Sequence, residues 1–256
     1  MAKVLRMVNA RSIMIKSTRS GEMDYADLAA TLAVHRDVPP VLFANIGTTM
    51  RGAVDDIGKI KFILKDLAIS RYYIHADAAL SGMILPFVDD PQPFGFDAGI
   101  DSIAISGHKM PGVPVPCGVV LARKEHVNRI SRAIEYIGTS DTTVAGSRSG
   151  ISVLFLWYEI MTLGIDGFRE IVAECMEVAD YAVQKFSGNG IDAWRNKNSP
   201  IIVFPRRNEN VLKKWQIATQ GTDAHIITMP HVTKKHIDSF MKEYLSAAEC
   251  RNEEAA

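Results

Sequence analysis

The sequence has 256 residues, of which 47% are hydrophobic and 23% are charged, and this balance excludes a disordered chain, a collagen-like fibre and a coiled coil. The 29 basic and 29 acidic residues cancel, so no net charge draws the chain to nucleic acid or to an anionic membrane. Cys117, Cys175 and Cys250 lie far apart without a CxxC pair, which favours a reducing compartment over a disulfide framework. No apolar run is long enough for a signal peptide or a spanning helix, and we expect a cytoplasmic protein with no nucleic-acid or membrane partner.

Short apolar runs alternate with helical patterns in the first part of the chain, which is typical of a mainly parallel sheet covered by helices. Residues 2–9 read as the tail of an amphipathic helix. The pattern predicts strands at 12–16, 40–45, 72–77, 102–106 and 118–122, with helices at 24–35 and 55–67. Several of these strands are apolar almost throughout, as in strands that are buried on both faces.

The pattern changes after about residue 150. Two long helices are predicted at 151–163 and 168–186, and Gly188-Asn189-Gly190 then breaks the chain. Strands at 201–204 and 225–229 follow, alternating with helices at 208–219 and 233–245. We therefore predict an α/β protein with a large domain at residues 1–160 and a smaller C-terminal α/β domain at residues 161–256.

Asp77 ends an apolar strand and is followed by two small residues, Ala78 and Ala79. Ligands of open α/β sheets lie beyond the carboxyl ends of the strands, which is where this carboxylate is expected. A helix N-cap would explain an isolated aspartate equally well. The alanines favour a ligand, because small side chains let a flat ring approach the backbone.

Lys109 follows the next apolar strand through Ser106, Gly107 and His108, which together offer hydroxyl, backbone and imidazole groups to an anion. A lysine at a strand end is usually only solvated, but here Met110-Pro111-Gly112 is expected to hold it in a turn. A lysine beside an aspartate at neighbouring strand ends is what pyridoxal phosphate needs, since the amine forms a Schiff base and the carboxylate keeps the pyridine nitrogen protonated.

The segments NIGTTMRGAVDD, YYIHADAALSGMILPFVDD, SGHKM, PCGVV and GSRSG together resemble the pyridoxal-phosphate-dependent group II amino-acid decarboxylases. The likeness covers nearly the whole chain and is strongest to the bacterial histidine decarboxylases, with the plant serine decarboxylases next. It implies the fold of type I pyridoxal-phosphate enzymes (aspartate-aminotransferase-like), a homodimer, and conversion of L-histidine to histamine and CO₂ with pyridoxal 5'-phosphate as cofactor.

The resemblance also implies roles for individual residues. Lys109 is similar to the family's Schiff-base lysine and Asp77 to the partner of the pyridine nitrogen. The other implied contacts are Ala79 on one ring face, Thr49 as a hydrogen-bonding residue, Ser106 and His108 on the phosphate side, and Asp55 as a supporting carboxylate.

A polar stretch at 135–143 follows Lys109 and reads as a surface loop. In related decarboxylases a loop here closes over the site and brings a tyrosine that protonates the substrate carbon. Tyr136 is the candidate for this proton donor, with His108 as the alternative. Tyr136 and the segment at 146–148 are also expected to complete the site of a second subunit.

Relatives of this type carry an N-terminal portion with a histidine that stacks on the free ring face and a Ser/Thr-rich loop for the phosphate. The sequence begins after that point, so we expect a truncated chain whose large domain is incomplete. Three alternatives stay open, namely serine decarboxylation to ethanolamine, another lyase or aminotransferase on the same fold, and an inactive remnant.

Other kinds of site have little support. His225, His231 and His236 cluster near the end of the chain, but their spacing fits no zinc signature. The sequence contains no GxGxxG dinucleotide motif and no GxSxG nucleophile elbow. We therefore expect no metal.

Overall fold

The computed structural model describes residues 2–134, 139–141 and 146–253, and side chains within 3–131 and 146–246. A four-stranded sheet forms the first part, with β1 (Val41–Asn45), β2 (Tyr73–Asp77), β3 (Ser102–Ser106) and β4 (Gly118–Ala122) in that spatial order. The first three strands are parallel and β4 is antiparallel to β3. The predicted mainly parallel sheet is therefore present, with one antiparallel edge strand.

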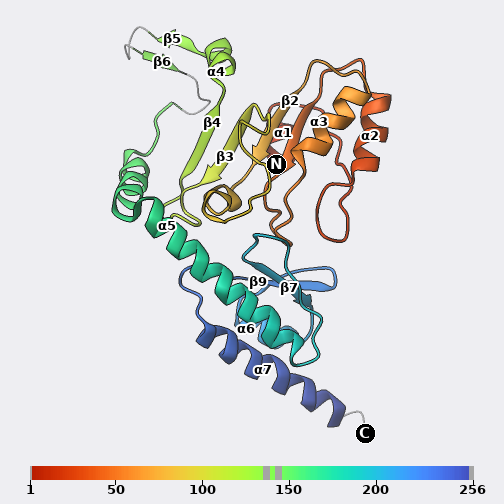
Figure 1. Ribbon diagram of the computed structural model, residues 1–256, viewed down its shortest axis with the longest axis vertical. Helices are drawn as coiled ribbons and strands as arrows, with labels where there is room; N and C mark the ends of the chain where they lie inside the picture. Colours follow the sequence, from red (N-terminus) through yellow and green to blue (C-terminus); the bar gives the residue numbers. More distant parts are fainter. Residues whose placement is uncertain (1, 135–138, 142–145, 254–256) are drawn as a thin grey trace.

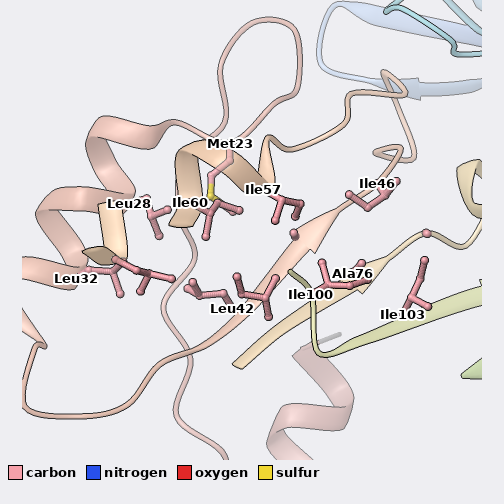
Figure 2. Packing of buried hydrophobic residues seen from close by; sticks show 14 of the residues in the cluster. Met23, Leu28, Leu32, Leu42, Ile46, Ile57, Ile60, Ala76, Ile100 and Ile103 are labelled. Carbon is pink, nitrogen blue, oxygen red and sulfur yellow. The ribbon is translucent and has the colours of Figure 1, made fainter. Parts of the chain in front are cut away.

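Two helices cover one face of this sheet. Asp24 caps α2 (Tyr25–Val34) by accepting hydrogen bonds from two backbone N–H groups, and Asp56 caps α3 (Ile57–Asp66) through the N–H of Lys59. Their apolar faces meet the sheet in a core that Figure 2 shows, formed by Leu28, Leu32, Leu42, Ile46, Ile57, Ile60, Leu64, Ile74, Ala76, Ile100 and Ile103, among others. The carboxyl ends of the strands are held in place by this packing.

Burial on both faces, which the apolar strands suggested, is wrong for the described chain. In β1 and β2 buried positions alternate with half-buried or exposed ones, because α2 and α3 pack on one face only. The strand predicted at 12–16 is wrong as well. This segment follows α1 (Ala2–Met7) and runs beside α2, where Lys16 bonds to Asp24 and Asp27 instead of to a neighbouring strand. Its Met14 side chain is 89% exposed.

The connection after β4 contains elements that the sequence patterns did not indicate. They are the short helix α4 (Lys124–Ile130) and a hairpin of β5 (Arg132–Ile134) and β6 (Thr139–Asp141). Figure 1 shows this hairpin extending away from the four-stranded sheet. The turns η1 (Ser81–Met83) and η2 (Leu85–Phe87) follow β2 in the chain.

The two long helices predicted after residue 150 are present as the two parts of α5 (Gly150–Ser187), which runs along both parts of the molecule (Figure 1). Gly164 leaves the helical conformation, with φ 60° and ψ −168°, close to where the break between them was expected. By length and mean hydropathy alone α5 could cross a membrane. Only 11% of its most apolar 18-residue window is buried, so by length and mean hydropathy the expectation that no run is long enough for a spanning helix is not met. Beyond Gly164, one face of the helix is buried against the small-domain core through Phe168, Val172, Cys175, Ala179, Ala182 and Phe186.

The C-terminal part has its own antiparallel sheet of β7 (Ile201–Pro205), β9 (Asp223–Ile227) and β8 (Ala218–Gln220), in that order. α5 and α7 (Lys234–Glu253) lie side by side against this sheet, and an aromatic cluster of Phe186, Phe204, Phe240 and Tyr244 joins them (Figure 1). The helix predicted at 208–219 is too long. α6 (Glu209–Lys214) ends early because Gln216 has a positive φ of 54° and residues 218–220 pair with β9. The domain boundary predicted at residue 160 falls inside α5, and its position stays a prediction.

Candidate functional site

A cavity of about 640 Å³ lies at the carboxyl ends of β1 and β2, between the two sheets. The large-domain wall of the cavity contains five residues that the sequence predicted to belong to the site, namely Thr49, Asp77, Ala79, His108 and Lys109. The first residue of β7, the last residue of β9 and the residues that follow β9 form the opposite wall. The structure thus brings together side chains that are up to 60 positions apart in the sequence, from 49 to 109.

Asp77 owes its place to strand register. It is the last residue of β2 and pairs with Asn45 at the end of β1 and with Ala104 of β3. Its Oδ1 accepts a long hydrogen bond of 3.4 Å from the N–H of Ala79, so the helix-cap interpretation has little support. The carboxylate is half-buried and keeps most of its acceptor capacity for a ligand in the cavity.

Asp77 also affects a neighbour on the same face of β2. His75 bonds through Nδ1 to the hydroxyl of Ser102 at 2.7 Å and meets the ring of Phe43 edge-on. Burial lowers the pKa of His75, and the negative charge of Asp77 partly opposes this effect. The imidazole beside the carboxylate is therefore neutral at neutral pH.

Lys109 is held in a turn between β3 and β4, as the sequence predicted. The N–H of Gly112 bonds to the Lys109 carbonyl at 3.0 Å, and the N–H of Val113 bonds to the Gly107 carbonyl at the same distance. Ser106 ties Lys109 and Ala79 together through its backbone, but it is not among the residues lining the cavity. The half-buried lysine faces the same cavity as Asp77.

His108 has a defined tautomer. The backbone N–H of Cys117 donates to its Nδ1 at 3.0 Å, and an N–H can only donate. The Cys117 carbonyl, which lies equally close to Nδ1, already accepts from the N–H of Gly107 at 2.8 Å. In the neutral ring the proton therefore sits on Nε2, so His108 can donate a hydrogen bond into the cavity that it lines.

The loop after β1 presents Thr49 to the cavity. Three hydrogen bonds between Thr48, Gly47 and Ala53 close the loop, one of them to the Thr48 hydroxyl. Gly47 has a φ of 99°, and a Cβ there would lie 2.1 Å from Oγ of Ser81. This loop geometry requires glycine at position 47.

Asp55 supports the loop from behind and does not line the cavity. The side chain is fully buried, and Oδ1 accepts from the N–H of Met23 at 2.8 Å. Oδ2 accepts from the N–H of Asn45 at 2.7 Å and from its Nδ2 at 3.2 Å. Burial nevertheless raises the pKa of Asp55, with the hydrogen bonds acting in the opposite direction. Asp55 thereby fixes Asn45, which does line the cavity.

The outer side of the same loop is bound to the small domain. Arg51 forms two hydrogen bonds with Asp223, of 2.6 and 3.2 Å, and both side chains are about three-quarters buried. The Met50 carbonyl accepts from Nδ1 of His225, and the Arg51 carbonyl accepts from Asn196. We call these contacts the interdomain clamp.

Sequence reasoning missed the small-domain wall of the cavity and part of the large-domain wall. The missed residues include Asn45, Gly47, Ile227, Met229, Pro230 and His231. Asn45 and Gly47 lie in the same segment as the threonines that the sequence analysis selected. The predicted strand end before Pro230 could have indicated that the residues around it line a site. Tyr136, the expected proton donor, lies outside the described residues.

Comparisons with known proteins agree with this geometry. The family model described as the pyridoxal-dependent decarboxylase conserved domain matches residues 1–199. A histidine decarboxylase from Vibrio campbellii is 50% identical over 232 residues, covering 90% of this chain and 60% of that protein. One from Morganella morganii is 48% identical over 240 residues, with coverage of 93% and 62%. The chain thus spans about 60% of the length of these curated relatives.

Solved structures support the fold. A sphingosine-1-phosphate lyase from Burkholderia pseudomallei has a TM-score of 0.79 at 16% identity, covering 97% of this chain and 60% of that one. L-Methionine decarboxylase from Streptomyces sp. 590 has a TM-score of 0.76 at 23% identity, with coverage of 91% and 60%. These likenesses concern the fold alone, and they confirm the predicted fold class.

Proposed function

Because the chain belongs to the pyridoxal-dependent decarboxylase family, we propose that it removes the α-carboxylate of an amino acid with pyridoxal 5'-phosphate as cofactor. The observation that carries the proposal is the single cavity shared by Lys109 and Asp77, with the small side chain of Ala79 beside them. The favoured reaction is conversion of L-histidine to histamine and CO₂, supported by the 45–50% identity to histidine decarboxylases.

The donor set of the cavity fits this cofactor. Lys109 offers an amine for the aldehyde, Asp77 an acceptor for the pyridine N–H, and Ala79 leaves one ring face free of bulk. The hydroxyl of Thr49 and the Nε2–H of His108 are donors for its oxygens. When bound, pyridoxal phosphate supplies a protonated ring that takes up the electrons left by the departing carboxylate.

Residues of the chain would orient the cofactor and deliver a proton to the substrate. Asp77 holds a proton on the ring nitrogen, because a carboxylate opposite that atom favours the charged form. Lys109 would anchor the cofactor through its side-chain amine. Ile227, Met229 and Pro230 form an apolar small-domain wall of the cavity.

Proton delivery to the substrate carbon is assigned to Tyr136, with His108 as the alternative. The tautomer of His108 supports the alternative, since its Nε2 carries the hydrogen and Cys117 fixes the ring. A variant series separates the two donors. If Tyr136→Phe abolishes amine release and His108→Gln lowers it only a few-fold, the tyrosine is the donor, and the reverse order assigns the role to His108.

The cofactor proposal is tested by mixing the chain with pyridoxal phosphate and recording visible absorption. A protein-bound band that Lys109→Ala removes and Lys109→Arg does not restore supports the anchor at Lys109. We expect Asp77→Asn to retain the band but to weaken binding, because the ring nitrogen loses its charged partner. A band of unchanged intensity in Lys109→Ala would refute the assignment.

Substrate choice is tested separately by supplying L-histidine and L-serine to the cofactor-loaded chain. Histamine without ethanolamine supports the proposal. Ethanolamine alone would identify a serine decarboxylase, and a keto acid would identify an aminotransferase. A folded chain that shows no protein-bound cofactor band would be an inactive remnant.

We also propose a homodimer in a reducing, cytoplasmic setting. Before Gly164, α5 exposes a row of apolar side chains, with Val153 66%, Trp157 57% and Met161 65% exposed. An exposed apolar face of this kind favours a second copy of the chain as its partner. Sedimentation equilibrium should give twice the chain mass, and Trp157→Lys should shift it to the monomer. A wild-type monomer would refute the dimer. The free, buried thiols of Cys117 and Cys175 support the reducing setting.

A further inference from the structure

The loop between β1 and α3 faces the cavity with one side only. Gly47, Thr48 and Thr49 line the cavity, whereas the next three residues do not. Four hydrogen bonds of 2.7–3.0 Å close the loop on itself. The carbonyl of Ala53 accepts two of them, and the carbonyl and hydroxyl of Thr48 accept the other two. Because the loop is closed in this way, we expect a displacement of its outer side to move Thr49 as well.

The outer side of the loop lies against the small domain. The interdomain clamp holds Met50 and Arg51. Gly52 adds a third contact, because a Cβ at this position would lie only 1.8 Å from Oγ of Ser199. The three loop residues that do not line the cavity are thus all in contact with the small domain.

The ion pair between Arg51 and Asp223 is the charged part of the clamp. Its side chains are only 28% and 26% exposed, and the guanidinium donates twice to one carboxylate oxygen, at 2.6 and 3.2 Å. The backbone of Asp223 is anchored on both sides, since it pairs with Pro205 of β7 and with Gln220 of β8. Removing either partner leaves a mostly buried charge unpaired, which is costly and favours movement of the loop toward water.

Another ion pair joins the two domains without touching this loop. Lys197 bonds to Asp90, and their side chains are 55% and 84% exposed. Exposed ion pairs contribute little to stability. Asp90→Asn is therefore a matched control, because it removes a carboxylate from an interdomain pair and leaves the loop contacts in place.

We propose that Arg51 and Asp223 are positioning residues, whose ion pair fixes the loop and thereby sets the position of Thr49 in the cavity. The affinity for the cofactor then depends on a small-domain residue, Asp223, that does not itself line the cavity. This second step rests on the proposed function, in which Thr49 donates a hydrogen bond to the cofactor. The first step concerns the chain alone.

The first step is tested without cofactor, by hydrogen exchange of the backbone amides in peptides that cover residues 47–53, with peptides from α3 as the check on general unfolding. We expect Asp223→Asn to raise the exchange rate of the loop about fivefold, and Asp90→Asn to leave it within about twofold of the wild type. Asp223→Glu keeps the charge and should restore part of the protection. A loop that exchanges at the wild-type rate in Asp223→Asn would overturn the proposal.

The second step is tested by titrating pyridoxal phosphate into the same variants and following the absorption band that depends on Lys109. We expect Asp223→Asn to raise the dissociation constant about fivefold. In a Thr49→Ala background the same substitution should have no further effect, because the residue through which it acts is already truncated.

If the effects of Asp223→Asn and Thr49→Ala on the dissociation constant simply add, the ion pair does not act through Thr49 and the proposal is wrong. A wild-type chain without the band would refute the proposed function, and the exchange measurement would still decide whether the ion pair fixes the loop.

Discussion

Replacing Asp55 by asparagine tests whether the buried carboxylate organises the site from behind. The three donors that converge on Asp55 leave room for no amide hydrogen. Asparagine is best placed with its oxygen toward the two donors of Asn45 and its NH₂ toward the N–H of Met23. The hydrogen bond to Met23 is then lost and two donors face each other, at a cost of about 1–3 kcal/mol.

Two smaller effects modify this cost. The bonds to Asn45 are no longer charge-assisted, which weakens each by about 1 kcal/mol. Removing a buried charge is favourable, in keeping with the raised pKa of Asp55, and offsets part of the loss. We expect Asp55→Asn to lower the free energy of unfolding by about 2 kcal/mol, or the melting temperature by about 4–8 °C.

The neighbouring Asp56→Asn is the matched control. Asp56 is 45% exposed and caps α3 through one N–H, a role that asparagine fills equally well. Urea unfolding of both variants, followed by circular dichroism, compares the two positions directly. If Asp55→Asn comes within about 0.5 kcal/mol of Asp56→Asn, the buried carboxylate does not have the structural role described here.

Three further outcomes follow from the structure. Gly47→Ala should destabilise the fold and impair cofactor binding, because the added Cβ would collide with Ser81. Gly190 also has a positive φ, of 70°, but has open space around it, so Gly190→Ala should lower the melting temperature less. The buried, neutral His225 binds a proton less readily in the folded chain than in the unfolded chain, so the free energy of unfolding should fall as the pH drops below about 6.5. His225→Gln should reduce this pH dependence, as measured by urea unfolding at several pH values. Burial raises the pKa of Cys175 to about 11, so iodoacetamide at about pH 8 should leave this thiol unmodified until urea is added. Peptide mass spectrometry would show the modification, and rapid labelling of the native chain would contradict the burial of Cys175.

The strands that carry the site were predictable because their signals are local. Apolar runs ending in Asp77 and Ser106 gave the strand ends within one residue, and the register of parallel strands then placed Asp77 beside Asn45. The segment at 12–16 has the same local pattern. It forms no strand because its backbone hydrogen bonds go to the cap residue Asp24 and to the side chain of Asp27, and the sequence does not encode these partners locally.

The small-domain wall depended on contacts that no local pattern encodes. His231 lines the cavity, although its sequence context indicated only a strand end. Asp55 reads as a helix cap next to Asp56, but the fold turns it inward to bonds with Met23, 32 residues away. Such long-range pairings are decided by tertiary packing.

The interdomain clamp connects the loop that carries Thr49 to the small domain. Arg51 is hydrogen-bonded to Asp223 and Met50 to His225, and both partners belong to β9 of the small domain. Tilting that strand must either break an ion pair whose side chains are about three-quarters buried or move the loop that carries Thr49. The position of Thr49 at the cavity therefore depends on the position of β9 in the small domain.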